Sequence, residues 1–178
     1  MGVSSDSGAV DGASALGEDE GVPPTFHVPA HPGSTGEAVS RRMRTLKRKN
    51  NDAELAVRHL LHAGGYRYRV HYPVPGLTRR TIDIAFTRAK VAVFIDGCFW
   101  HGCLEHGTAP RSNGAWWNAK LRANRERDED TAQHLTRQGW EVLRVWEHEA
   151  PEIAAERAID ALRRAQCNLD RSPAAPSP

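Results

Sequence analysis

The pattern of apolar and polar positions predicts a short helix near residue 52, followed by strands. Asp52 can cap a helix that runs to about Ala63 and ends at Gly64. Its expected buried face consists of Leu55, Leu60 and Leu61. Tyrosines and Val70 then alternate with polar residues over Tyr66–Tyr72, which is typical of a half-buried strand.

Two further strands are predicted after a loop over Pro73–Arg80 that contains a Pro-Gly turn. In Thr81–Phe86, Ile82, Ile84 and Phe86 should face one side, and Thr81, Asp83 and Ala85 the other. A short turn leads into the apolar strand Val91–Asp96.

The last third of the folded region predicts helix, strand, helix. A long helix is expected from about Ala115 to Gln138, where Gly139 stops it, and a fourth strand over Glu141–Glu147. Pro151 opens a final helix to about Ala165. Three strands, a helix, a strand and a helix after the first helix predict an α/β fold around one mixed sheet.

Composition limits this domain to residues 40–166. Residues 1–39 are rich in Gly, Ser, Ala and Pro, contain six acidic residues and no Lys or Arg, and should be disordered. Residues 167–178 have a similar composition and the same expectation. Without the leader, 24 basic residues stand against 16 acidic ones, a net charge of +8.

The basic excess lies mainly in residues 40–81, with eleven Lys or Arg against Asp52 and Glu54. Such a block indicates a polyanionic partner, most often nucleic acid, although a solvated helix face has the same composition. No signal peptide or membrane span is visible, and three cysteines make no disulfide framework. We therefore expect a cytoplasmic protein in which a close Cys pair binds metal.

Carboxylates at the strand ends predict a Mg²⁺ site. If the second and third strands form a hairpin about Arg88–Ala89, Asp83 lies opposite Phe94, and Asp96 lies diagonally across on the same face. Glu54 can approach from the first helix, and oxygen ligands suit Mg²⁺. In the alternative, Asp83 pairs with Arg79 or Arg80, and Asp96 caps a turn.

Soft ligands follow the third strand and predict a structural zinc site. Cys98, Cys103 and His106 lie within nine residues, and His148 directly after the fourth strand is the best fourth ligand. Alternatively, Cys98 is a small core residue and the histidines are surface groups. His101 is left over as a general base or acid near Asp96, unless it replaces His106 on the zinc.

Large aromatic residues occur in pairs next to this segment. Phe99-Trp100 and Trp116-Trp117 can wedge between base pairs, although core packing is expected for one residue of each pair. Lys120 on the long helix can contact phosphate, as can Arg44 and Lys47 in the basic segment Ser40–Asn50. The later turns of that helix, with Glu126, Asp128, Glu129 and Asp130, should form a solvated, self-paired face.

Taken together, these motifs resemble the very short patch repair (Vsr-type) DNA mismatch endonucleases over about residues 40–150. The similarity lies in the helix with Glu54, in Thr81-Ile82-Asp83-Ile84, and in the segment from Val93 through Asp96-Gly97-Cys98-Phe99-Trp100-His101. It continues through Trp116-Trp117-Asn118-Ala119-Lys120-Leu121, Asn124-Arg125-Glu126-Arg127-Asp128, Gly139-Trp140-Glu141-Val142 and Val145-Trp146-Glu147.

This resemblance implies a restriction-endonuclease-like (PD-(D/E)xK-type) fold. It also implies Mg²⁺-dependent nicking of duplex DNA 5′ to the thymine of a T:G mismatch, the product of 5-methylcytosine deamination. By position, Asp83 and the Ile95 carbonyl resemble the metal ligands, His101 the residue that activates water, and Glu54 its support. Phe99, Trp100 and Trp117 resemble the intercalating aromatics, and Cys98, Cys103, His106 and His148 the zinc site.

Two departures from the family pattern matter. Asp96 stands where some members carry a second active-site histidine, so it either binds a second cation or holds His101. The cysteine segment is shorter than in those members, and His148 replaces a cysteine. We expect a nucleoid-associated monomer that other repair proteins can recruit. The alternatives are a related nuclease acting on foreign or unmodified DNA, and a non-catalytic, zinc-stapled DNA-binding module.

Overall fold

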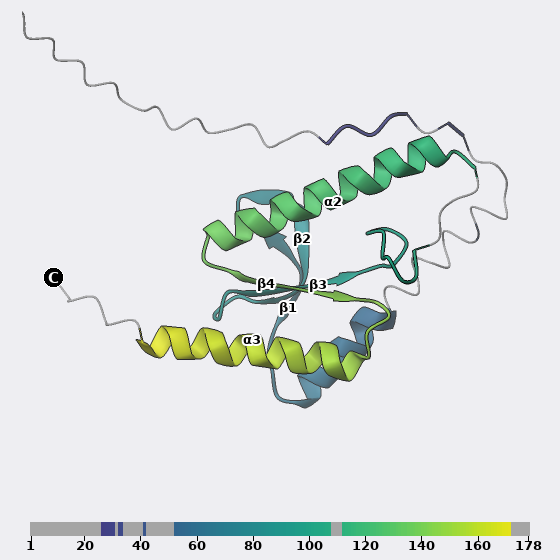
Figure 1. Cartoon of the computed structure of the whole chain (residues 1–178). Helices are drawn as coiled ribbons and strands as arrows, with labels where there is room; N and C mark the ends of the chain where they lie inside the picture. Colours follow the sequence, from purple (N-terminus) through teal and green to yellow (C-terminus); the bar gives the residue numbers. More distant parts are fainter. Residues whose placement is uncertain (1–25, 31, 34–40, 42–51, 108–111, 172–178) are drawn as a thin grey trace, which may run out of the picture.

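A four-stranded mixed sheet forms the centre of the protein (Figure 1). This computed structural model describes residues 26–30, 32–33, 41, 52–107 and 112–171. The strands are β1 (Arg69–Val74), β2 (Leu77–Phe86), β3 (Val91–Asp96) and β4 (Glu141–Trp146). They lie side by side in chain order; β1, β2 and β3 are antiparallel, whereas β4 runs parallel to β3. The prediction of an α/β fold around one mixed sheet is confirmed.

Helices cover both faces of this sheet (Figure 1). A helix over residues 52–63 and α3 (Pro151–Arg171) lie on one face, and their apolar residues pack on Ile84, Val91 and Val93. Helix α2 (Gly114–Arg137) covers the other face, where Leu135 packs with Ile82, Ala85 and Ala92. Among the helices of the described residues, none is long and apolar enough to cross a bilayer.

The predicted register of the β2–β3 hairpin is confirmed. Ile84 pairs with Val93 and Phe86 with Val91, so that continuation of the ladder places Asp83 opposite Phe94. The strict alternation predicted for β2 is wrong, however. Ile82 shares a cluster with Ala85, whereas Ile84 and Phe86 belong to the other cluster. The alternation of β2 side chains between the two faces of the sheet therefore breaks at Asp83, between Ile82 and Ile84.

The predicted loop over Pro73–Arg80 is too long. β1 extends to Val74 and β2 begins at Leu77, so only Pro75-Gly76 forms the turn. Proline fixes the first turn position, and Gly76 supplies a φ of 77° at the second. Val74 is completely buried, and this burial extends the strands beyond the point that local composition indicated.

Two expected core positions are also wrong. Leu60 is 37% exposed, whereas Val57 is buried in its place, because Glu54, Val57 and Leu61 follow one helical face toward the sheet. Val70 is 39% exposed, and strand β1 starts later than predicted, at Arg69 rather than Tyr66. The buried face of the first helix therefore carries a carboxylate, Glu54.

The ends of the later elements agree closely with expectation. α2 ends one residue before its predicted end, and Gly139 follows with a φ of 78°. α3 starts at Pro151 as predicted but runs past Ala165 to Arg171. Two residues of the predicted leader contact the domain: the Phe26 ring lies 5.6 Å from the Arg80 guanidinium, and the Pro29 carbonyl accepts a 2.8 Å hydrogen bond from Trp116.

Candidate active site and metal centre

A polar cavity opens beside the ends of β3 and β4. Its acidic and imidazole groups are Asp83 from β2, Asp96 from β3, Asp128 from α2, and His101 from the loop after β3. Arginines line it as well: Arg79, Arg80, Arg127 and Arg144. The structure thus brings Asp83 and His101 into one cavity, and its arginines suit a phosphate group.

Asp83 is held by the backbone of the neighbouring strand. Its Oδ2 accepts a 2.8 Å hydrogen bond from the Ile95 amide. Burial raises the pKa of Asp83 to about 6; the Ile95 hydrogen bond opposes this rise, and the negative charges of Glu54 and Asp96 add to it. The alternative partner Arg80 instead binds Asp130 at 2.6 Å. Asp83 is therefore a desolvated carboxylate that a cation would stabilise.

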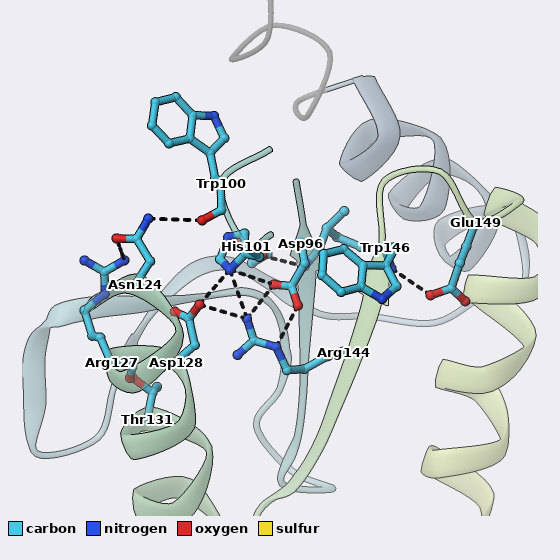
Figure 2. Close-up of polar contacts among 12 residues, drawn as sticks. Asp96, Trp100, His101, Asn124, Arg127, Asp128, Thr131, Arg144, Trp146 and Glu149 are labelled. Atoms are coloured by element: carbon cyan, nitrogen blue, oxygen red, sulfur yellow. Dashed lines mark hydrogen bonds and ion pairs between the residues drawn. The ribbon is translucent and has the colours of Figure 1, made fainter. Parts of the chain in front are cut away.

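Asp96 is paired with Arg144, a residue that the sequence did not indicate. The Arg144 Nε and Nη2 donate hydrogen bonds of 2.7 and 2.5 Å to the two Asp96 oxygens (Figure 2). Burial lowers the pKa of Arg144, but the hydrogen bond and charge of Asp96, together with the charges of Asp128 and Asp83, outweigh burial and leave that pKa raised. Both oxygens of Asp96 are thus occupied by a permanent cation, which leaves little capacity for a metal ion.

His101 contacts Asp128 rather than Glu54. Its Nδ1 lies 2.6 Å from Asp128 Oδ2 and 3.6 Å from Asp96 Oδ1 (Figure 2). Asp128 comes from α2, in the stretch predicted to be a solvated, self-paired face; for Asp128 that prediction is wrong. One helical turn earlier on α2, the Asn124 side chain donates a hydrogen bond to the Trp100 carbonyl, so this face of the helix packs on the loop that carries His101.

Glu54 contacts Arg58 and His71. Its Oε1 lies 3.3 Å from Arg58 Nη1 and 3.9 Å from His71 Nε2. The ligand atoms of Glu54, His71 and Asp83 all lie within 4.8 Å of one another. The structure thus brings Glu54 to Asp83, as expected, and adds His71 from β1, which the sequence analysis did not select.

The four predicted zinc ligands converge. The ligand atoms of Cys98, Cys103, His106 and His148 lie within 4.8 Å of one another. Cys98 Sγ is 3.0 Å from His148 Nδ1, and Cys103 Sγ is 3.8 Å from it and 4.0 Å from His106 Nδ1. Four ligands around a tetrahedral zinc are roughly 3.3–3.8 Å apart, so the residues present fit this ion.

The parallel pairing of β3 and β4 explains this convergence. Asp96 pairs with Trp146, so that the segments carrying Cys98 and His148 leave the sheet at neighbouring points. Glu147 accepts a 2.7 Å hydrogen bond from the Cys98 amide and holds the two segments together. Burial and the nearby Cys103 raise the pKa of the Cys98 thiol to about 12, so a bound cation would be needed to hold Cys98 as a thiolate.

The predicted wedge residues form one aromatic cluster. The Phe99 ring centroid lies 5.1 Å from those of Trp100 and Trp117, and Trp116 packs on Trp117 at 4.8 Å. Phe99 is buried, whereas Trp100 and Trp117 are partly exposed. Lys120 follows one turn later on α2, and Arg44 and Lys47 lie outside the described residues.

Comparison with known proteins agrees with this arrangement. The family model described as DNA mismatch endonuclease Vsr matches residues 34–105. Type II nicking enzyme V.NaeI from Lentzea aerocolonigenes is 43% identical over 145 residues, covering 80% of this chain and 87% of the relative. Type II nicking enzyme V.XorIIP from Xanthomonas oryzae pv. oryzae is 40% identical over 115 residues, covering 64% and 82%.

A third relative, DNA mismatch endonuclease Vsr from Escherichia coli, is 31% identical over 111 residues, covering 61% of this chain and 68% of the relative. Together with the sheet and its acidic, arginine-lined cavity, these similarities define a DNA endonuclease. The chain belongs to the Vsr family.

Proposed function

We propose that this endonuclease nicks duplex DNA 5′ to the thymine of a T:G mismatch and thereby initiates very short patch repair. The observation that carries this proposal is the convergence of Asp83 and His101 in one arginine-lined cavity, next to an aromatic cluster. A hydrolytic site, a phosphate-binding surface and a wedge are the three parts that such a reaction needs.

Asp83 and the Ile95 carbonyl are the proposed ligands of a catalytic Mg²⁺. When bound, this ion stabilises charge on the phosphate oxygens and on the leaving 3′-oxygen. His101 takes a proton from the attacking water. Because its Nδ1 faces Asp128 at 2.6 Å, a hydrogen on Nδ1 would leave Nε2 free to accept that proton.

Asp96 and Arg144 form a hydrogen-bonded pair in the lining of this cavity. With both Asp96 oxygens bound by Arg144, the pair does not supply a second cation site. The Arg144 charge also lies in the cavity that a phosphate would enter. The zinc held by Cys98, Cys103, His106 and His148 is structural in this proposal, because four protein ligands leave no open position.

Trp100 and Trp117 are the proposed wedge, with the buried Phe99 behind them. A mismatch costs less to unstack than a paired step, so insertion there favours T:G sites. Lys120, Arg44 and Lys47 are the proposed phosphate contacts. Residues 40–166 would form a monomeric nuclease domain with a restriction-endonuclease-like core, and its place of action is the nucleoid.

A second candidate is the nicking of fully paired DNA at a specific sequence. The names of the relatives at 43% and 40% identity favour it, because both are Type II nicking enzymes. In that case the wedge residues would distort a paired step instead of a mismatch. The non-catalytic module is disfavoured, because the chain belongs to an endonuclease family.

A nicking assay distinguishes these candidates. Zinc-loaded protein with Mg²⁺ is incubated with matched sets of T:G and fully paired duplexes that vary in the neighbouring bases. Nicks confined to T:G duplexes, 5′ to the thymine, support the proposal. Equal nicking of a paired duplex would favour the second candidate, and Asp83→Ala should bind DNA without nicking either substrate.

A further inference from the structure

His71 on β1 lies beside the proposed catalytic carboxylates, although the sequence analysis assigned it no role. Val70 pairs with Ile84 and Tyr72 with Ile82, so His71 lies opposite Asp83 in the β1–β2 ladder. Glu54 approaches the same point from the helix over residues 52–63. Three different elements therefore bring a nitrogen and two carboxylates together.

The distances suit ligands of a shared cation better than a direct ion pair. His71 Nε2 lies 3.9 Å from Glu54 Oε1, beyond hydrogen-bonding distance, and all three ligand atoms fall within 4.8 Å. Two ligands each about 2.1–2.2 Å from one metal are roughly 3 Å apart at right angles and roughly 4.3 Å apart when opposite. The 3.9 Å distance between His71 Nε2 and Glu54 Oε1 lies in this range.

Charge and burial indicate that the point needs a cation. Glu54 is only 7% exposed, and Asp83 is the desolvated carboxylate described above. Arg58 Nη1 donates a long 3.3 Å hydrogen bond to Glu54 Oε1. The His71 side chain, by contrast, is 59% exposed, so its ring adds a donor at the solvent side of two carboxylates that face inward.

The backbone of His71 supports a role for this particular side chain. Its φ is 46°, in the left-handed region that non-glycine residues seldom occupy inside a strand. Tyr72, the next residue, packs into the core cluster beneath α2, whereas Val70 is exposed. β1 thus departs from regular strand geometry at the residue that faces Asp83.

We propose that His71 is a third protein ligand of the cation held by Asp83 and Glu54, and that it biases this site toward Mn²⁺ over Mg²⁺. Nitrogen donors strengthen binding of first-row transition ions, whereas Mg²⁺ prefers an all-oxygen set. This inference rests on the proposed function only in that Asp83 is a ligand in both the proposed nuclease site and this cation site. Ion binding at this site is measurable without DNA.

The test is Mn²⁺ binding to the zinc-loaded full-length protein. The affinity is measured by titration calorimetry, and the electron spin echo signal of bound Mn²⁺ reports coupling to a histidine nitrogen. His71→Asn should weaken Mn²⁺ binding at least about 10-fold, change Mg²⁺ binding much less, and remove the nitrogen coupling. Asn tolerates the positive φ at this position. His71→Gly, which relieves the backbone strain, should lose the same Mn²⁺ affinity and nitrogen coupling.

His62→Gln, at an exposed position on the helix over residues 52–63, is the matched control and should keep both affinity and coupling. Unchanged Mn²⁺ affinity and coupling in His71→Asn would overturn the proposal. So would nitrogen coupling that persists in Asp83→Asn, since it would place the ion elsewhere, for instance among the zinc ligands.

Nicking is scored separately, so failure of the two proposals is distinguishable. Nitrogen coupling that depends on His71, in a protein that nicks no T:G duplex, would uphold this site and reject the proposed function. T:G nicking without any such coupling would do the reverse.

Discussion

Arg144 binds Asp96 through two hydrogen bonds, 2.7 Å from Nε and 2.5 Å from Nη2, at a point where Asp96 is only 6% exposed. The two residues come from the parallel neighbours β3 and β4, and the same guanidinium lies 3.3 Å from Asp128. One arginine therefore balances two of the carboxylates that surround His101.

Removing this arginine should be costly. Arg144→Met leaves the buried Asp96 carboxylate without its cation, and we expect the free energy of unfolding to fall by about 3 kcal/mol in urea titrations. Adding Asp96→Asn should recover most of that loss. The control is Arg164→Met, which breaks an exposed pair with Glu141 and should cost under about 1 kcal/mol. Equal effects of the two arginine variants would show that burial adds nothing to the Asp96 pair.

Asp83→Asn should separate stability from activity. The folded-state pKa of Asp83 is about 6, above the unfolded value of 3.8. The cost of burying its charge therefore grows as the pH rises from 3.8 to about 6, and it is complete above that. Below about pH 4 the group is neutral in both states and the penalty vanishes. In metal-free protein, Asn should therefore raise stability at pH 7 by about 1–3 kcal/mol and at pH 4 hardly at all.

The same substitution should abolish nicking, because Asn supplies no charge for a metal. Asn can still accept the hydrogen bond from the Ile95 amide, so the local structure is kept. Thermal unfolding between pH 4 and 8, together with single-turnover nicking, measures both effects. A destabilised Asp83→Asn protein at pH 7 would contradict the assigned burial cost.

Asp128→Asn tests the partner of His101. If Asp128 accepts the Nδ1 hydrogen, its loss should lower the single-turnover nicking rate by about 10²–10⁴-fold while DNA affinity changes little. Glu129→Gln, one residue further on the exposed side of α2, is the matched control. A rate loss shared by both variants would point to general charge near the DNA instead of to the histidine.

Cysteine substitutions test the metal cluster. Cys98→Ser should release zinc and lower the melting temperature, since the proposed zinc site joins the segments that follow β3 and β4. Cys167→Ser changes an exposed cysteine on α3 and should keep both zinc and stability. Elemental analysis with thermal unfolding measures the outcome; zinc content unchanged in Cys98→Ser would reject this ligand set.

Local patterns predicted the parts of the site that depend on neighbouring strands. The hairpin about Arg88–Ala89 fixed the register, and so placed Asp83 beside Ile95. The soft ligands clustered in sequence, and the fourth, His148, followed a recognisable strand. The hairpin register is set by turn length and strand period, which are local properties. The meeting of His148 with the cysteines also requires the parallel pairing of β3 and β4.

The missed residues depend on packing between distant elements. Asp128 lies in an acidic stretch whose composition is that of a solvated helix face, and only the way α2 lies across the sheet brings it to His101. Arg144 and His71 are polar residues in strands. Arg144 meets Asp96 through the pairing of its strand, and His71 stands out only through its unusual φ. Neither signal exists in a single segment.

Helix α2 carries both Trp117 and Asp128, eleven positions apart on one uninterrupted rod. At 1.5 Å per residue this separation is about 16 Å along the helix axis. Under the proposed function, the distance between the wedge residue Trp117 and the aspartate that contacts His101 is therefore fixed by one helix. A single inserted residue would turn the indole by about 100° relative to the acid and decouple recognition from hydrolysis.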